Sequence, residues 1–176
     1  MTPGAKNHTL GLIGFGGIGK EIAKRAVPFG MEVLYYCRHP KDEFGARYAE
    51  LDELLRKSDY VSINVPLNES TVNMIDEKIF SKMKNGAVFI NTARSKIVDT
   101  SALVYALKSG RLSSAAVDVF DNEPCTDSPL VGLPNVVLTP HTAPFTKENF
   151  REMNNRAAKS VIEFFNGTLD SRYLIG

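Results

Sequence analysis

The sequence Gly-Phe-Gly-Gly-Ile-Gly at residues 14–19 constrains the fold of this chain more than any other feature. It lies between an apolar run at 9–13 and a segment with the periodicity of an amphipathic helix. A strand, a turn without side chains and a helix whose first N–H groups face a pyrophosphate produce this pattern. Gly14 would allow the turn, Gly16 the approach of phosphate, and Gly19 the packing of helix on strand. The alternative is a glycine-rich turn between packed elements, but the flanking pattern favours a dinucleotide site.

Segments typical of strands and helices alternate along the chain, which predicts parallel βαβ units with right-handed crossovers. The predicted strands are residues 9–13, 32–36, 60–65, 87–91, 115–119 and 136–138. The predicted helices are residues 17–29, 51–57, 76–83, 100–109 and 147–166. The sequence therefore predicts an α/β fold with a Rossmann-type, doubly wound parallel sheet in three αβα layers. Residues 1–176 are expected to form a single dinucleotide-binding domain.

Charge and cysteine content exclude several classes of function. The 21 basic and 20 acidic residues are interspersed and give a net charge of +1, without a basic stripe for nucleic acid. No apolar run approaches the roughly 20 residues of a membrane span, and residues 1–7 lack the apolar core of a signal peptide. Cys37 and Cys125 have neither metal-ligand spacing nor a disulfide framework. A cytoplasmic protein is expected, with no metal and no membrane or nucleic-acid partner.

Chemically capable side chains follow three of the predicted strands. Arg94 follows the strand at 87–91, Asp118 lies at the end of the strand at 115–119, and His141 follows the strand at 136–138. Open parallel sheets bind ligands beyond the carboxyl ends of their strands. We therefore expect these three side chains to converge where a nicotinamide would lie.

Three further motifs follow the glycine-rich turn in a fixed order. They are Asn-Thr-Ala-Arg-Ser-Lys-Ile-Val-Asp at 91–99, Asp-Val-Phe-Asp-Asn-Glu-Pro at 118–124 and Thr-Pro-His-Thr-Ala at 139–143. Together the four motifs resemble the cofactor-binding domain of the D-2-hydroxyacid dehydrogenase family, which includes glyoxylate and hydroxypyruvate reductases and phosphoglycerate dehydrogenases. The resemblance runs from residue 9 to residue 166. It implies an oxidoreductase that transfers hydride between NAD(P)H and a 2-oxo or 2-hydroxy acid, and a homodimer.

The resemblance implies catalytic roles for three side chains. Arg94 would bind the substrate carboxylate and carbonyl, since its planar guanidinium can hold two oxygens. His141 would protonate the carbonyl oxygen and act as the base in the reverse direction. Glu123 would pair with His141 and stabilise its imidazolium. The alternatives are a structural ion pair for Arg94 and solvated loop positions for His141 and Glu123.

The same resemblance implies the residues that contact the cofactor. Backbone N–H groups of Gly17 and Ile18 would face the pyrophosphate, and Asp118 would hydrogen-bond near the nicotinamide. The family pattern has glycine after the arginine, so Ser95 is expected to place a side chain near the cofactor. The remaining implied contacts, besides Arg94 and His141 themselves, are Val65, Pro66, Thr71, Thr92, Ala93 and Ala143.

The end of the second predicted strand bears on the choice of cofactor. NAD-selective members carry an acid there, about twenty residues after the glycines, that binds the adenosine ribose. Here the position holds Cys37, and Arg38 follows as a cation that could meet a 2′-phosphate. In the alternative, Cys37 is a small filler and Arg38 points to solvent, and some members without the acid still use NADH. We expect NAD or NADP to bind, with NADP accepted.

Family members have a second, substrate-binding domain, which is expected to be absent from this chain. The start Met1-Thr2-Pro3-Gly4 resembles a domain boundary. The chain alone is then expected to bind nucleotide and to turn over substrate weakly or not at all, because the closed cleft is lost. Two other interpretations stay open: a nucleotide-sensing, corepressor-like interaction module and a non-catalytic remnant of the family.

Overall fold

The computed structural model describes residues 4–40 and 43–173, without the side chain of Arg172. The chain divides into two compact units, Met1–His141 and Thr142–Gly176. The first three residues of the start that resembles a domain boundary lie outside the described residues, so that interpretation stays a prediction. Among the described helices, none has the length and apolar character needed to cross a membrane.

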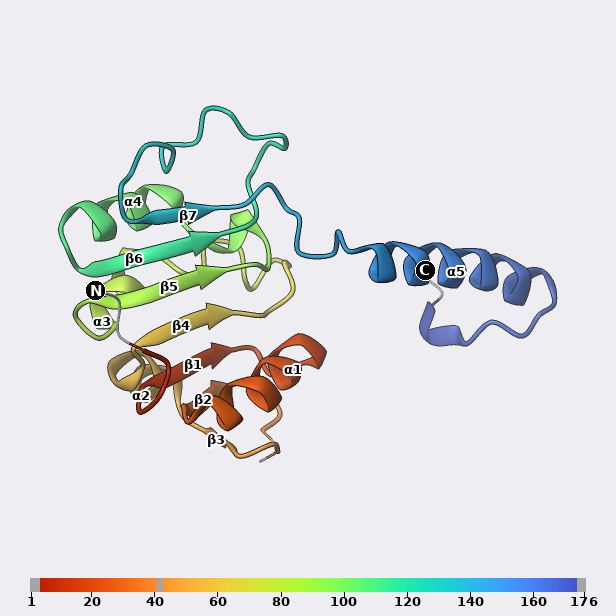
Figure 1. The fold of residues 1–176 in the computed structure, drawn as a ribbon, viewed down its shortest axis with the longest axis horizontal. Helices are drawn as coiled ribbons and strands as arrows, with labels where there is room; N and C mark the ends of the chain where they lie inside the picture. The colour runs from red at the N-terminus through yellow and green to blue at the C-terminus, as the bar shows by residue number, and fades with distance from the viewer. Residues whose placement is uncertain (1–3, 41–42, 174–176) are drawn as a thin grey trace. The chain divides into compact units, whose positions relative to one another are not determined.

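The first unit is built on a sheet of seven strands, which are all parallel to their neighbours (Figure 1). The strands are β1 (Thr9–Ile13), β2 (Glu32–Tyr36), β3 (Ala46–Tyr48), β4 (Tyr60–Ile63), β5 (Ala87–Asn91), β6 (Leu112–Val117) and β7 (Val136–Leu138). Their order is β3-β2-β1-β4-β5-β6-β7. The order reverses between β1 and β4, and ligands bind at such a switch point in open α/β sheets. The predicted doubly wound parallel sheet is confirmed.

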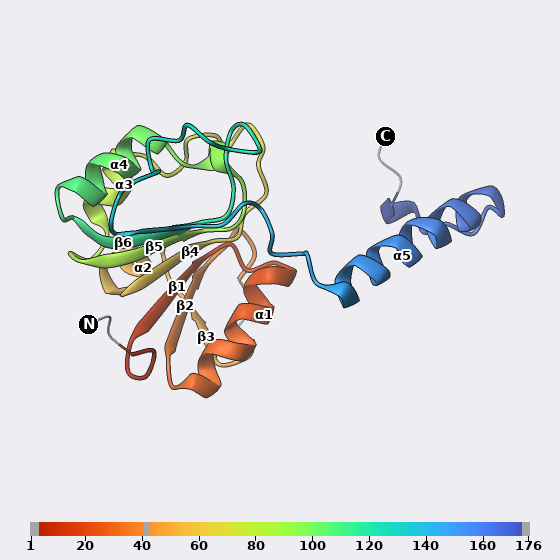
Figure 2. The same ribbon diagram turned by 45° about the horizontal axis from the view of Figure 1, so that its top comes forward.

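Helices cover both faces of this sheet, which gives the predicted three layers (Figure 2). The helix α1 (Gly17–Ala26) packs on β1 and β2 from one side. The helices α2 (Leu51–Lys57), α3 (Glu77–Lys82) and α4 (Thr100–Lys108) lie on the other side. Each face has its own buried cluster. Leu12, Ala23 and Tyr35 belong to the α1 side, and Leu54, Phe80, Phe89 and Leu103 belong to the other.

Within the first unit, no described helix covers β4–β7 on the α1 face (Figure 1). Strand register places Ser62, Ile90, Ala116 and Val137 in one row across this face. Ile90, Ala116 and Val137 belong to neither buried cluster, and residue Val137 is 64% exposed. This part of the sheet therefore presents an uncharged, partly apolar surface.

Local chemistry explains where the helices of the first unit begin and end. The predicted helix at 17–29 gives way after Ala26 to the 3-10 turn η1 (Val27–Phe29), because Pro28 cannot donate the next helical hydrogen bond. Asp76 and Asp99 cap α3 and α4: Asp76 Oδ1 accepts from the Ile79 N–H, and Asp99 Oδ1 accepts from the N–H groups of Ser101 and Ala102. The cap predicted for Asp99 is confirmed.

The second unit contains α5 (Lys147–Phe165) and the 3-10 turn η3 (Ser171–Tyr173). Thr146 Oγ1 accepts a hydrogen bond from the Asn149 N–H at 3.1 Å and so caps α5. Gly167, with φ +68°, follows its end. No residue of α5 is buried. The predicted helix at 147–166 is confirmed, with its last residue one position earlier.

The boundaries of two strands differ from the predicted ones. β6 begins at Leu112 instead of residue 115, because its start pairs with Ala87 across a register irregularity. It ends at Val117, so Asp118 lies just beyond the strand and not within it. β4 ends at Ile63 instead of residue 65, which leaves Val65 in the loop that follows.

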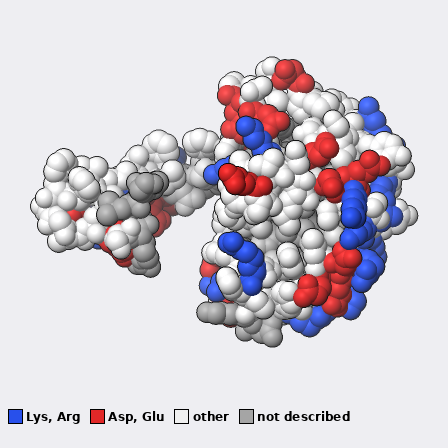
Figure 3. All heavy atoms as spheres, turned by 180° about the vertical axis from the view of Figure 1, so that it is seen from behind, with Lys and Arg blue, Asp and Glu red and all other residues white. Residues whose placement is uncertain are grey.

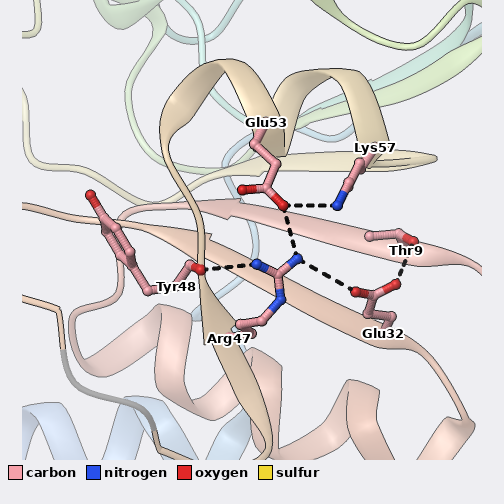
Figure 4. Close-up of polar contacts among 6 residues, drawn as sticks. All are labelled: Thr9, Glu32, Arg47, Tyr48, Glu53 and Lys57. Carbon is pink, nitrogen blue, oxygen red and sulfur yellow. Dashed lines mark hydrogen bonds and ion pairs between the residues drawn. The ribbon is translucent and has the colours of Figure 1, made fainter.

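The edge strand β3 was not predicted, and a polar cluster around Arg47 holds it in place (Figure 4). Arg47 Nη2 lies 3.1 Å from Glu53 Oε1 and 3.9 Å from Glu32 Oε1. Lys57 Nζ lies 2.8 Å from Glu53 Oε1, and Thr9 Oγ1 donates to Glu32 Oε2 at 3.4 Å. Hydrogen bonds from Lys57 and Arg47 lower the pKa of Glu53. The cluster therefore links β1, β2, β3 and α2.

Candidate functional site

Two glycines of the 14–19 motif are required by the packing of the chain itself. Gly14 has φ +100°, and a Cβ at Gly14 would lie 2.5 Å from the carbonyl oxygen of Asn64. A Cβ at Gly19 would lie 2.4 Å from the carbonyl oxygen of Gly14. A side chain at either position would force backbone to move. These distances agree with the turn and the helix packing that the motif predicts.

Gly16 and Gly17 have no such internal reason to be glycine. Gly16 has φ −78° and ψ −161°, which any residue can adopt. Apart from the adjacent residues, no atom of the described residues lies within 4 Å of a Cβ built at Gly16 or Gly17. The space they leave open lies at the first turn of α1, where N–H groups lack helical acceptors. A phosphate group fits this space and these donors, so the site fits a dinucleotide.

Two adjoining pockets lie at the carboxyl ends of the strands. The β2 pocket, of about 510 Å³, is lined by Gly14, Phe15, Gly16, Tyr36, Cys37, Arg38, His39, Asn64, Val65, Pro66, Asn68, Ser70, Thr71 and Met74. The β5 pocket, of about 470 Å³, is lined by Gly16, Gly17, Ile18, Ile63, Asn64, Val65, Pro66, Leu67, Thr92, Ala93 and Arg94. Gly16, Asn64, Val65 and Pro66 line both, so the two pockets adjoin along the glycine-rich turn.

The β2 pocket has no carboxylate among its described lining residues. Arg38 and His39 are exposed at its rim, and Cys37 is half-buried. Thr71 lines the pocket, but its hydroxyl accepts from the Asn68 N–H and donates to the Pro66 carbonyl, both at 2.8 Å. The Thr71 hydroxyl therefore shapes the loop that forms one wall.

Arg94 lies in the loop that follows β5, at the edge of the β5 pocket. Its side chain is exposed, and its Nη1 donates to the Ala93 carbonyl at 2.6 Å. Ser95 begins the 3-10 turn η2 (Ser95–Ile97) and lines neither the β2 nor the β5 pocket. It lines a separate cavity of about 240 Å³ with Asn91 and Cys125. The expectation that Ser95 stands near the cofactor stays a prediction.

Glu123 and His141 form the predicted pair. His141 Nδ1 lies 2.8 Å from Glu123 Oε2, and Glu123 Oε1 accepts from the Phe120 N–H at 3.0 Å. These hydrogen bonds, first that of Phe120 and then that of His141, lower the pKa of Glu123 from 4.5. Since Nδ1 faces Glu123, Nε2 is the ring nitrogen that can serve a ligand.

The backbone at His141 is in a conformation that residues other than glycine rarely adopt. Its φ is +54°, and its N–H donates to the Thr139 carbonyl at 3.0 Å. The Thr139 hydroxyl donates to Asp118 Oδ1, and Asp118 is buried. Asp118 therefore helps to hold the turn that leads into His141. Strained backbone of this kind concentrates at functional sites, where the surrounding contacts maintain it.

The Glu123–His141 pair should survive acidification to below pH 4.5. Because the folded-state pKa of Glu123 is lowered, its contribution to stability is present above 4.5 and is lost as the pH falls through the lowered pKa. We expect ¹³C NMR titration of the Glu123 carboxyl carbon to give a pKa below 4.5 in the wild type. His141→Asn should raise that pKa only in part, since the Phe120 N–H still donates. A wild-type pKa of 4.5 or higher would contradict the pairing.

Most of the predicted site residues line one of the two pockets, but not all of them. Gly19 is buried behind the turn and lines neither pocket, and Glu123, Asp118 and His141 lie outside both pocket linings. Ala143 belongs to the second unit, so its role stays a prediction. Sequence reasoning missed Asn64, which lines both pockets. A polar amide directly after a buried apolar strand is the signal that could have found it.

The described part of the chain was also searched for clusters of metal ligands and for the distribution of charge on its surface. No group of three or more His, Cys, Asp or Glu residues that could hold a metal ion occurs among the described residues. Figure 3 shows Lys and Arg side chains mixed with Asp and Glu side chains over the first unit on the face seen from behind.

Comparison with known proteins finds a matching family model and similar enzymes. Residues 1–143 match the family model for the D-isomer specific 2-hydroxyacid dehydrogenase, NAD binding domain. Glyoxylate reductase of Thermococcus litoralis is 45% identical over 170 residues, which is 94% of this chain and 51% of the relative. Glyoxylate/hydroxypyruvate reductase B of Klebsiella pneumoniae is 44% identical over 170 residues, 93% of this chain and 53% of the relative.

A solved structure has the same fold. The D-lactate dehydrogenase with NAD+ from Lactobacillus jensenii superposes with a TM-score of 0.90 at 34% identity, covering 100% of this chain and 58% of that one. The chain thus spans about half the length of the curated relatives it matches.

Proposed function

The chain belongs to the D-isomer specific 2-hydroxyacid dehydrogenase family, whose NAD-binding domain it matches, and we propose that it serves an oxidoreductase that interconverts 2-oxo and 2-hydroxy acids with NAD(P)H. One observation carries this proposal: the open glycine turn, the two adjoining pockets and the Glu123–His141 pair all follow the carboxyl ends of one sheet's strands. Glyoxylate and hydroxypyruvate are the first substrates to test, because relatives at 44–45% identity are named for them.

The two pockets would hold the two halves of the dinucleotide. The β2 pocket, at the end of the second strand, would take the adenosine half, and the β5 pocket would take the nicotinamide half. N–H groups at Gly17 and Ile18 would meet the pyrophosphate. Val65 and Pro66 would contact both halves, and Thr92 and Ala93 the nicotinamide half. When bound, the cofactor supplies or accepts the hydride.

The side chains beyond the strands would handle the substrate and its proton. Arg94 would bind the carboxylate, since a guanidinium carries five N–H donors and only its Nη1 donates to Ala93 here. His141 would give a proton from Nε2 to the carbonyl oxygen during reduction and take one from the hydroxyl during oxidation. Glu123 would stabilise the imidazolium form through Nδ1. Asp118 would keep the His141 turn in place and hydrogen-bond near the nicotinamide.

Arg38 would make the chain accept NADPH. It is exposed at the rim of the β2 pocket, where no described lining residue is a carboxylate that would repel a 2′-phosphate. Loss of a charge-assisted hydrogen bond predicts that Arg38→Ala weakens NADPH binding about tenfold and NADH binding much less. Fluorescence titration of both cofactors measures this, with Arg56→Ala, on α2, as the control for a lost surface charge. Equal losses for the two cofactors would contradict the role of Arg38.

A single experiment tests the proposed function. NADPH and NADH oxidation by the chain is followed with glyoxylate and with hydroxypyruvate, and the affinity for each cofactor is measured in parallel. Binding with little or no turnover is the result we expect, because the relatives are about twice as long as this chain. Absence of binding would overturn the proposal, and rapid turnover would overturn the expectation that a separate substrate-binding domain is needed.

Self-association as a homodimer forms a second part of the proposal. The uncharged face over β4–β7 supports it, because two copies could bring this surface together without burying a charge. Analytical ultracentrifugation of the chain tests it. A monomer at all concentrations would contradict it without affecting the cofactor site.

A further inference from the structure

The loop that carries Arg94 is tied to the sheet by one buried side chain, that of Asn91. Asn91 ends β5 and is 2% exposed. Its Oδ1 accepts from the Ala93 N–H at 3.0 Å, and its Nδ2 donates to the Arg94 carbonyl at 3.1 Å. The amide therefore uses its acceptor and its donor on two successive residues of the loop. The Arg94 side chain then donates back to the Ala93 carbonyl at 2.6 Å.

We propose that Asn91 is a positioning residue, which fixes the Thr92–Ala93–Arg94 wall of the β5 pocket and so sets where Arg94 stands. This inference rests on the proposed function, because the wall matters only if the β5 pocket receives a ligand. Only an amide offers an acceptor and a donor in this geometry. Aspartate offers two acceptors and would set a carboxylate against the Arg94 carbonyl in a buried place.

The two pockets allow a positioning role to be separated from a structural one. Thr92, Ala93 and Arg94 line the β5 pocket and are absent from the described lining of the β2 pocket. A displaced loop should therefore weaken a ligand that fills both pockets and spare a ligand that needs only the glycine turn and the β2 pocket. NADH is the first kind of ligand, and ADP is the second.

The experiment compares the affinities of Asn91→Asp and Asn91→Ser for NADH and ADP by calorimetry. We expect NADH affinity to fall about tenfold in both variants, the effect of a lost buried hydrogen bond, with ADP affinity unchanged. Asn135→Asp is the matched control. Asn135 Nδ2 also donates to a backbone carbonyl, that of Ser113 at 3.3 Å, but Asn135 lines neither pocket. This control should lose thermal stability and keep both affinities.

Two outcomes of the calorimetry would overturn the inference: equal losses for NADH and ADP, or unchanged NADH affinity in Asn91→Ser. A measurement that needs no ligand tests the inference about Asn91 separately from the proposed function. Hydrogen exchange at the Ala93 amide should speed up when Asn91→Ser shortens the acceptor side chain, and an unchanged rate would overturn the inference even in a chain that binds no nucleotide. Wild-type protein that binds neither ligand would instead count against the proposed function.

Discussion

Replacing His141 with Asn is expected to lower NAD(P)H oxidation with glyoxylate by about 100- to 10,000-fold, the usual scale for a positioned proton transfer. The affinity for the cofactor should stay nearly constant, because His141 lies outside both pocket linings. Asn is the replacement of choice, since it tolerates the φ of +54° found at His141 better than other residues do. A folded variant that loses the reaction would tie the loss to the imidazole.

The measurement needs an active reference protein. Since the chain spans about half the length of its relatives, the rate is measured for the chain alone and for a hybrid. In the hybrid the chain replaces the matching part of the Thermococcus litoralis glyoxylate reductase. His8→Asn is the control, because His8 lies near the start of β1 and its ring hydrogen-bonds to the nearby Lys6 carbonyl at 3.1 Å. Near-wild-type turnover of His141→Asn in the hybrid would remove His141 from the mechanism.

Substitutions at Gly14 and Gly16 should separate folding from binding. Gly14→Ala is expected to lower the free energy of unfolding by about 3 kcal/mol or more, since it combines an unfavourable φ with a clash against backbone. Gly16→Val should cost less than about 1 kcal/mol, mostly from a poorer helix cap. It should nevertheless weaken dinucleotide binding about 100-fold, because the new side chain occupies the space left for phosphate.

Urea denaturation and cofactor titration of the same samples measure both effects. Gly86→Ala controls for backbone conformation alone, because Gly86 has φ +77° but, among the described residues beyond its neighbours, no atom lies within 4 Å of its added Cβ. It should destabilise the chain less than Gly14→Ala does. If Gly16→Val bound dinucleotide as tightly as the wild type, the open space at the start of α1 would not be a phosphate site.

The sequence predicted those elements of the fold whose signals are local. Apolar runs bounded by turn residues located β1, β2, β5 and β7, and the cap at Asp99 located α4. The strand β3 has no such signal, because it is three residues long and its central Arg47 is held by Glu53 and Glu32 from other elements. The start of β6 could not be predicted either. It depends on an irregularity in the pairing of β5 with β6, where Ala87 pairs with Leu112 but Val88 pairs with Ser114.

The candidate site was predictable to a similar degree. Glycine spacing identified the turn, and family resemblance brought together Glu123 and His141, which lie 18 positions apart in the sequence. The motif did not predict that Ser95 lines a separate cavity with Asn91 and Cys125. The two hydrogen bonds of the Asn91 side chain were missed for a related reason. The sequence shows that Asn91 ends an apolar strand, but no sequence pattern shows which backbone groups of the next loop its amide contacts.

The polar cluster of Figure 4 lies away from the two pockets, toward the amino ends of the strands. Thr9 and Glu32 begin β1 and β2, and the Asp59–Lys84 pair, at 2.6 Å, lies just before β4 and β5. These ion pairs are partly exposed and screened by salt, and none of their residues lines either pocket. A fluorophore or a surface tether attached at this edge, for example at Lys57, would leave the ligand edge untouched, provided that the coupling chemistry spares the free thiol of Cys37 in the β2 pocket. The amino ends of the strands are therefore a suitable attachment site for immobilised or single-molecule measurements of cofactor binding.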